Sequence, residues 1–259
     1  MIASRVQSVG GPLSSIAATF VDAETVAPGA HDPAVFLGRR MDLRGSVALA
    51  QQLEDCDAPG AAAAPGTRTQ LSVLIDDRVG AIRELVVRTF ADPFQRRNKL
   101  RTPEQMAAIL NEPALFDSRP RSLAAAADAV WAPCGDLLGR TLDQVRFELG
   151  ALREDIGPPL AGLGVATARL ERLDGALFGA TAKGRAELED RLLSAVARSF
   201  ASRFVVAVGA LPAAVTAADL HGWFEIGGLL RAAVDRGRDA ILGILAHDAR
   251  RLAALVASS

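Results

Sequence analysis

The residues best placed to do chemistry are four positive charges in one short stretch, Arg96, Arg97, Lys99 and Arg101. No acidic residue lies in the surrounding segment, residues 93–103, to neutralise them. Such a patch can contact nucleic-acid phosphates or an acidic protein, because its cations replace the counterions of the polyanion. A loop whose charges are only solvated is the other interpretation, and the commoner one. The sequence therefore makes residues 96–101 a candidate contact for nucleic acid or an acidic partner.

Metal binding and nucleophilic catalysis find less support. His221 and Glu225 are four residues apart, as two ligands on one helical face would be, but a zinc site needs three or four ligands and the sequence places no third. Cys134 has no histidine near it in sequence, which favours a buried structural cysteine over a nucleophile. Glycine-rich phosphate loops and the nucleophile elbow of hydrolases are absent. We therefore predict no catalytic residue, no metal and no cofactor.

Composition favours a folded helical protein. Of the 259 residues, 50% are apolar and 23% are charged, which is typical of a globular chain with its own core. Aromatic residues make up only 5% and tyrosine is absent, which disfavours sheets and base-stacking surfaces. The abundant alanine and leucine favour helix instead. The formal net charge of −1 provides no overall field that would attract nucleic acid or an anionic membrane.

Cysteine usage and hydropathy predict a soluble, cytoplasmic protein. Cys56 and Cys134 are the only cysteines and lie far apart, which excludes a disulfide framework and fits a reducing compartment. No apolar segment near the N-terminus resembles a secretion signal. The longest apolar run, Phe204–Val215, is broken by glycine and proline, and it is shorter than the roughly 20 residues of a membrane span. We therefore expect no membrane insertion.

The elements that must position any site are long helices. Residues 136–204 contain three runs in which leucine or another apolar residue recurs every three or four positions, the spacing of a helix packed along a partner. Pro158 and Pro159 are expected to break the first helix, because proline lacks the amide proton. We predict a long antiparallel pair formed by Asp136–Ile156 and Leu160–Phe204. The three runs are Leu138, Leu142, Val145, Leu149, Leu152 and Ile156; Leu163, Leu170, Leu173 and Leu177; and Leu188, Leu192, Val196, Phe200 and Phe204.

The rest of the chain divides into three parts. Residues 1–55 read as an N-terminal helical segment, 56–68 as an Ala/Pro/Gly linker, and 69–259 as a helical bundle. Thr69 is expected to cap the first bundle helix, and Thr102 and Thr216 begin capping boxes of the next helix and of the last one. The fold class predicted is all-α: an elongated helical bundle with long, antiparallel, coiled-coil-like helices.

The C-terminal helix carries the predicted partner surface. Ile241, Leu245, Leu252 and Leu255 form one apolar stripe, with small alanines beside it. A terminal amphipathic helix with no later segment to cover it must dock backward or bind another chain. We predict that Trp223–Leu230 docks on the bundle, with a break or a close helix approach at its Gly-Gly pair. The stripe is expected to stay available to a partner or to a second copy.

Three segments of the chain also carry a family resemblance. The tail has Trp223–Leu230, then Asp239–Leu242 and Leu252–Val256; the N-terminal part has Phe36–Leu49; the centre has Ile156–Leu160. These segments resemble parts of a family of proteobacterial helical proteins. The tail resembles the family's Gly-Gly-Trp-Leu-like turn and leucine-rich helix. The N-terminal part resembles its Phe…Leu-x-Asp-Leu segment, and the centre resembles its Gly-Pro-Leu junction. That family is similar to the accessory component of type III Zorya anti-phage systems.

The resemblance implies a context and no catalytic residues. Such accessory proteins accompany a motor similar to flagellar MotA and MotB, which spans the inner membrane, and they act on its cytoplasmic side. We therefore expect a non-enzymatic protein that binds other defence-system components, namely a second accessory protein or the motor complex. Homo-oligomerisation is a further expectation. The alternative is a nucleic-acid-binding effector that uses residues 96–101.

Overall fold

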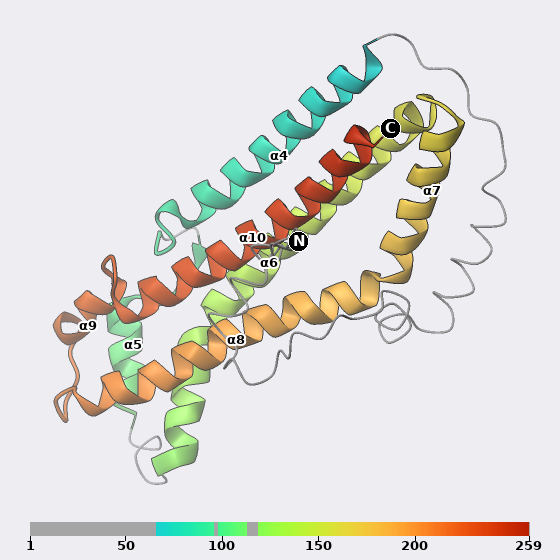
Figure 1. Cartoon of the computed structure of the whole chain (residues 1–259). Helices are drawn as coiled ribbons and strands as arrows, with labels where there is room; N and C mark the ends of the chain where they lie inside the picture. The colour runs from blue at the N-terminus through green and yellow to red at the C-terminus, as the bar shows by residue number, and fades with distance from the viewer. Residues whose placement is uncertain (1–65, 96–97, 113–118, 259) are drawn as a thin grey trace, which may run out of the picture.

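The computed structural model describes residues 66–95, 98–112 and 119–258 (Figure 1). They form helices, which account for about 85% of them, and no strand, so the predicted all-α helical bundle is confirmed. The N-terminal segment 1–55 and most of the 56–68 linker lie outside the described residues. The helices are α4 (Thr67–Ala91), α5 (Pro103–Leu110), α6 (Arg119–Ala161), α7 (Val165–Ala180), α8 (Ala182–Gly209), α9 (Ala217–Phe224) and α10 (Leu229–Ala257).

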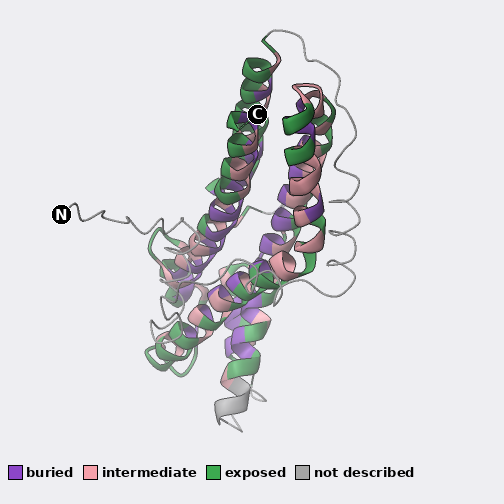
Figure 2. Cartoon of the chain, turned by 45° about the vertical axis from the view of Figure 1, so that its right-hand side comes forward, coloured by how far each residue is buried: buried purple, intermediate pink, exposed green. Residues whose placement is uncertain are grey.

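The central helix is α6, which packs against α4, α5, α7, α8 and α10. Every apolar residue of its predicted stripe, from Leu138 to Ile156, is buried. Figure 2 shows the same pattern along the bundle, with buried residues on the inward sides of the helices and exposed residues outside. The three-to-four spacing therefore identified the packed face of α6 correctly.

The predicted break at Pro158 and Pro159 is wrong, and Pro133 also lies inside α6. The two prolines leave only the carbonyls of Glu154 and Asp155 without an amide donor, and both residues are exposed, so water can satisfy them. Leu160 follows the prolines and is fully buried, which holds the last turn against the core. The chain reverses after it, before Gly164, whose φ of 149° favours glycine.

The second limb of the predicted antiparallel pair consists of two helices. They meet at Thr181, whose hydroxyl donates to the Leu177 carbonyl at 2.6 Å. In α8 the predicted stripe from Leu192 to Phe204 is buried, whereas Leu188 is exposed. In α7 the leucine stripe is not core: Leu170 is exposed and the other leucines are half-buried. The buried residues of α7 are Thr167, Ala168 and Ala176.

Two apolar clusters form the core. The larger joins α4, α5, α6, α8, α9 and α10, and a series of ring contacts runs through it. Trp131 stacks on Phe200 at 5.0 Å between centroids, and Phe204 contacts Trp223 at 5.8 Å. The smaller cluster lies where α4, α6 and α10 pack together farther along the bundle. Its buried members are Leu71, Ile75, Leu152, Ile156, Leu160, Leu252 and Val256.

The predicted partner stripe on α10 is covered by this chain. Ile241, Leu245 and Leu252 are each no more than 3% exposed, and Leu255 is half-buried against the smaller cluster. Because α10 packs along α4, α6 and α8, helices that precede it in sequence bury the stripe. The prediction that these residues remain available to a partner is therefore wrong for the three that are buried.

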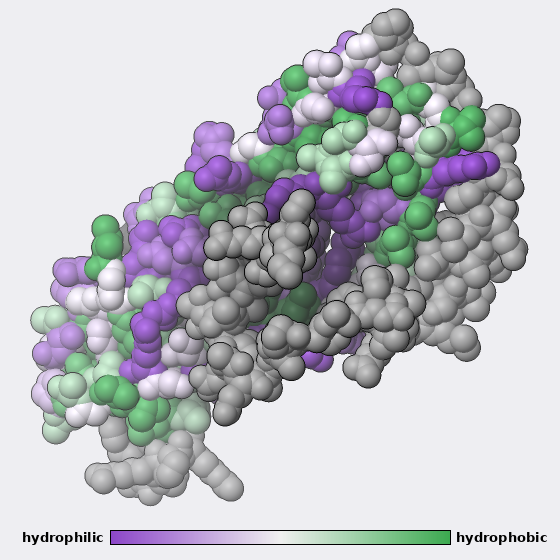
Figure 3. Space-filling model, in the orientation of Figure 1, coloured by the Kyte–Doolittle hydropathy of each residue, from purple (hydrophilic) through white to green (hydrophobic). Residues whose placement is uncertain are grey.

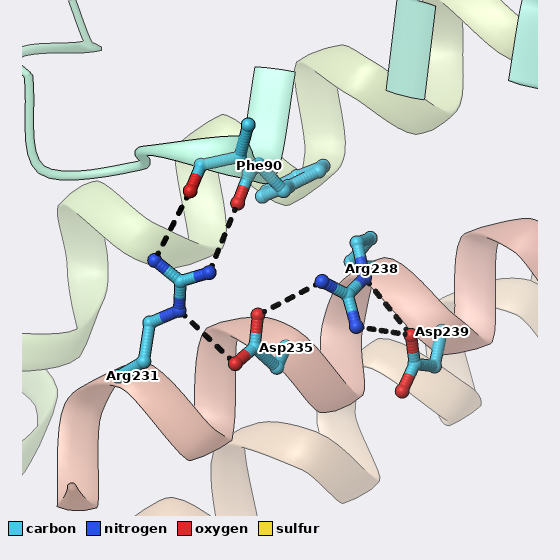
Figure 4. A network of polar contacts seen from close by, with 6 residues as sticks. Phe90, Arg231, Asp235, Arg238 and Asp239 are labelled. Carbon is cyan, nitrogen blue, oxygen red and sulfur yellow. Dashed lines mark hydrogen bonds and ion pairs between the residues drawn. The ribbon is translucent and has the colours of Figure 1, made fainter. Parts of the chain in front are cut away.

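A polar network fixes the end of α4 to α10 (Figure 4). The Arg231 guanidinium donates to the carbonyls of Phe90 and Ala91, which end α4 and have no partner within the helix. It also donates to Asp235 at 3.0 Å, and Asp235 accepts from Arg238 at 3.1 Å. Each arginine of this network therefore has a carboxylate partner.

The helix starts agree with the sequence in two places and differ in one. Thr102 forms a capping box with Gln105, and Thr216 donates to Asp219 from both its amide and its hydroxyl. By contrast, α4 begins at Thr67 after Gly66, so Thr69 is not its cap. The predicted break at the Gly-Gly pair is confirmed, since α9 ends at Phe224 and α10 begins at Leu229. A Cβ on Gly228 would lie 2.0 Å from a backbone oxygen, so only glycine fits there.

One helix of the described part of the chain, α8, is long and apolar enough in composition to cross a membrane. Length and composition do not distinguish such a span from the core helix of a bundle. In α8, the apolar residues Leu192, Val196, Phe200 and Phe204 are buried against neighbouring helices.

Candidate anion-binding site

The basic loop chosen from the sequence does not converge on one place. Arg96 and Arg97 lie outside the described residues, and Lys99 is exposed. Arg101 is half-buried, and its Nε donates to the Ala129 carbonyl of α6 at 2.9 Å. Arg101 therefore attaches the loop to the bundle, and of the two described charges only Lys99 is exposed to solvent.

The structure also describes the positions of the residues considered for metal binding and for nucleophilic catalysis. His221 is exposed on α9, and Glu225 follows the end of that helix. No group of three or more His, Cys, Asp or Glu side chains that could hold a metal occurs within the described ranges. Cys134 is buried inside α6, as predicted, and burial raises the pKa of its thiol to about 12. A thiol held neutral in this way is a poor nucleophile.

The structure instead brings together three arginines that are far apart in sequence. Arg153 of α6, Arg185 of α8 and Arg251 of α10 all lie over the ring of Phe178 in α7, and we call this group the arginine cluster. Their Cζ atoms are 4.2, 3.4 and 5.7 Å from the ring centroid, in that order. At these distances the ring face attracts a guanidinium. One phenylalanine therefore gathers cations from three other helices.

One carboxylate, Asp174, holds two of these arginines. It lies four residues before Phe178, so both side chains project from the same face of α7. Asp174 accepts from Arg251 Nε at 2.9 Å and also forms an ion pair with Arg153. The side chains of Asp174 and Arg153 are only 16% and 17% exposed, so the pairing is largely removed from water.

Arg185 has no such partner. No carboxylate of the described residues forms an ion pair with it, and its Nε is buried without a hydrogen-bond acceptor. Its neighbour Arg146 pairs with Asp143 at 2.9 Å and with Glu189 at 2.6 Å, although its Nη2 is also buried without a hydrogen-bond acceptor. A buried charged donor without an acceptor costs about 1–3 kcal/mol or more. Arg185 is therefore the member of the arginine cluster with unused binding capacity.

Electrostatics inside the cluster disfavour positive charge. Burial, followed by the charges of Arg251 and Arg185, lowers the pKa of Arg153 to about 10. Burial also lowers the pKa of Arg185 and of Arg251, against the attraction of Asp248. Three guanidiniums thus repel one another in a site where Asp174 contacts two of them, and the negative charges of Glu171, Glu189 and Asp248 also act on the cluster.

A cavity of about 560 Å³ opens beside the arginine cluster between α6 and α7. Arg153 and Phe178 line it, and Glu154 and Glu171 lie on its wall. Four glycines line it as well, so no side chains from those positions fill the space: Gly150 and Gly157 of α6, and Gly175 and Gly179 of α7. Figure 3 shows hydrophilic and hydrophobic side chains mixed at the upper right of the visible face, where α7 and the end of α6 lie. The volume falls within the usual range of small-molecule sites.

The sequence offered only one local signal for this site, the i,i+4 pair of Asp174 and Phe178. Residues 153, 185 and 251 belong to three different helices, and nothing in their spacing predicts that they meet. Comparison of the chain with protein-family models, with characterised proteins and with solved structures finds no match.

Proposed function

We propose that this protein is a non-enzymatic helical protein that works by binding, and that the arginine cluster binds a small molecule through a phosphate-like oxyanion. The observation that carries the proposal is the state of Arg185, which stacks on Phe178 with its buried Nε unpaired. Guanidiniums match the oxygens of phosphate and carboxylate groups, and their hydrogen bonds to ionised acceptors are about twice as strong as neutral ones.

The neighbouring groups support a small ligand. Arg153 lies both in the arginine cluster and on the cavity wall, so it connects the unpaired cation to a volume of about 560 Å³. Glu154 and Glu171 on the same wall repel anionic groups there. The arginines favour an anionic group at the cluster, and the two glutamates disfavour one in the rest of the cavity. A ligand with a single oxyanion group and an otherwise neutral structure therefore fits better than a polyanion does.

The defence context that we expect from the sequence resemblance is part of the proposal. In that setting the protein would bind a second accessory protein or the motor complex on the cytoplasmic side. Ligand binding would then serve this protein–protein role rather than a reaction. Burial raises the pKa of the Cys134 thiol to about 12, which makes that cysteine a poor nucleophile.

Thermal unfolding in the presence of inorganic phosphate tests the proposed site. A ligand at 100 times its Kd stabilises the folded state by about 2.7 kcal/mol, so phosphate should raise the Tm of the wild-type protein. Arg185→Gln should abolish that rise. Arg238→Gln is the matched control, because Arg238 pairs with Asp235 and Asp239 away from the cluster. Sodium chloride at equal ionic strength controls for general salt effects.

The outcomes are distinct. A rise in Tm that is the same for chloride and phosphate, or the same for the wild type and Arg185→Gln, would contradict the proposal. A nucleoside and its monophosphate, compared in the same assay, test whether the phosphate group carries the binding. Equal shifts for those two compounds would also count against it.

A further inference from the structure

The attachment of α7 to the bundle differs from that of the other long helices. Its buried residues are only Thr167, Ala168 and Ala176, in contrast to the long apolar stripes of α6, α8 and α10. Leu170 is exposed, and Leu173 and Leu177 are half-buried. Small residues bury little apolar surface, so α7 gains less hydrophobic stabilisation than its neighbours do.

Ionic contacts supply much of what holds α7. The Asp174 carboxylate reaches Arg251 of α10 at 2.7 Å from Nη2 and at 2.9 Å from Nε, and it also reaches Arg153 of α6. The Asp174 backbone carbonyl accepts from Arg251 at 3.5 Å as well. One acidic side chain thus joins α7 to two other helices.

Short junctions bound α7 at both ends. Gly164, with φ 149°, precedes its first residue, and Thr181 alone separates it from α8. Hinges are often a few element-terminal residues of this kind, which absorb changes in φ and ψ. The helix can therefore change its position as a unit when its ionic contacts change.

The Asp174 carboxylate occupies the guanidiniums that an incoming oxyanion would use. Arg251 donates to it and Arg153 forms an ion pair with it, whereas no carboxylate of the described residues pairs with Arg185. Resting on the proposed function, we infer that Asp174 is an internal competitor for the ligand: a bound phosphate group displaces its carboxylate from Arg153 and Arg251 and thereby loosens α7.

The charge balance favours this exchange. A phosphate group brings up to two negative charges to guanidiniums that share one carboxylate, and it adds acceptors for Arg185. Once displaced, the Asp174 carboxylate lies beside the bound anion, and like charges repel. Glu171, which attracts Arg153, and Asp248, which attracts all three arginines, stay in place and set a limit on the affinity.

Asp174→Asn tests the inference, because it keeps the shape of the side chain and removes its charge. The variant should bind inorganic phosphate about tenfold more tightly than the wild type, since the competing state is lost. Asp235→Asn is the matched control, as Asp235 also bridges two arginines, at 3.0 and 3.1 Å, outside the site. That control should leave the phosphate affinity unchanged, as measured by titration calorimetry.

Hydrogen exchange of the wild-type chain provides a second measurement that needs no variant. Phosphate should speed amide exchange within residues 165–180 by several-fold relative to chloride, while exchange in α6 and α10 slows or stays the same. Unchanged or slower exchange in α7 would overturn the inference. So would an Asp174→Asn variant that binds phosphate no more tightly than the wild type.

The two proposals can fail separately. Phosphate binding by the wild type, without tighter binding by Asp174→Asn or loosening of α7, leaves the site and removes the competition. Absence of phosphate binding in both the wild type and Asp174→Asn removes the site itself, and the competition with it.

Discussion

At the scale of single residues, the surroundings decide what a buried charge does. Arg231 and Arg238 share the carboxylate of Asp235, and Arg231 also satisfies two carbonyls at the end of α4. Those arginines connect helices and have little capacity left. Arg185 is also half-buried, but it stacks on a phenylalanine with its Nε unpaired. The same residue type is thus structural in one place and available for a ligand in the other.

Cys134 provides a prediction at this scale. Burial raises the pKa of its thiol from an ordinary value of about 9 to about 12, so folding favours the neutral thiol. The resulting stabilisation is complete below pH 9 and is lost as the pH rises toward 12, because the unfolded chain ionises first. Between pH 9 and pH 10 the wild type should lose about 1 kcal/mol of unfolding free energy that Cys134→Ala does not lose.

Urea unfolding at pH 8, 9 and 10 measures this difference. The window ends near the lowered pKa of Arg153, above which loss of that cation would stabilise the fold and oppose the effect. Identical pH dependence in the wild type and Cys134→Ala would show that the thiol is not protected as described.

At the scale of helices, the sequence predicted which face of a helix is buried better than it predicted where the helix ends. The apolar spacing predicted the buried sides of α6 and α8, because a packed face needs side chains at those intervals. It failed for α7, where leucines recur at helical spacing but small residues are buried. It also failed at Pro158 and Pro159, because a buried Leu160 and solvated carbonyls outweigh the local cost of proline. Local signals do not include the tertiary contacts that decide such cases.

The close approach of α6 and α10 leads to a prediction for one glycine. A Cβ on Gly237 would lie 2.5 Å from both Cδ atoms of Leu138 and 3.1 Å from its Cγ, and Leu138 is only 1% exposed. Rotation of the leucine tip does not relieve this clash, so Gly237→Ala should destabilise the protein by about 1–3 kcal/mol. Gly80→Ala is the control, since nothing lies within 4 Å of its added Cβ.

The control should stabilise the protein by about 0.5–1 kcal/mol, because alanine is the better helix former. Opposite signs in the two unfolding midpoints are the expected result. A stabilising Gly237→Ala would mean that α6 and α10 pack less closely than the structure has them.

At the scale of the molecule, the fold was predictable and the candidate site was not. Composition and periodicity sufficed for an all-α bundle because they depend on neighbouring residues. The arginine cluster depends on the register of four helices, because its three arginines come from α6, α8 and α10 and meet over Phe178 of α7. The prediction of an interface on α10 was wrong for the same reason, because the residues that cover it are distant in sequence. The helix that covers much of it, α4, starts more than 150 residues earlier in the chain.

The double variant Ile241→Asp/Leu245→Asp tests the arrangement of the whole bundle. Both side chains are no more than 2% exposed in the larger core cluster, where α4, α6, α8 and α10 meet. Each substitution removes apolar contacts worth about 2–5 kcal/mol and introduces a carboxylate with no partner there. The lost contacts of both positions, together with the cost of burying two charges, exceed the usual total stability of about 5–15 kcal/mol. The variant should therefore lose its cooperative thermal transition, which circular dichroism at the helical band measures.

Val206→Asp is the control, because Val206 is 75% exposed on α8 and the same change there should alter stability by no more than about 0.5 kcal/mol. A double variant that keeps its helical signal and a cooperative transition, and changes only its state of association, would show that the α10 stripe is an interface and not core.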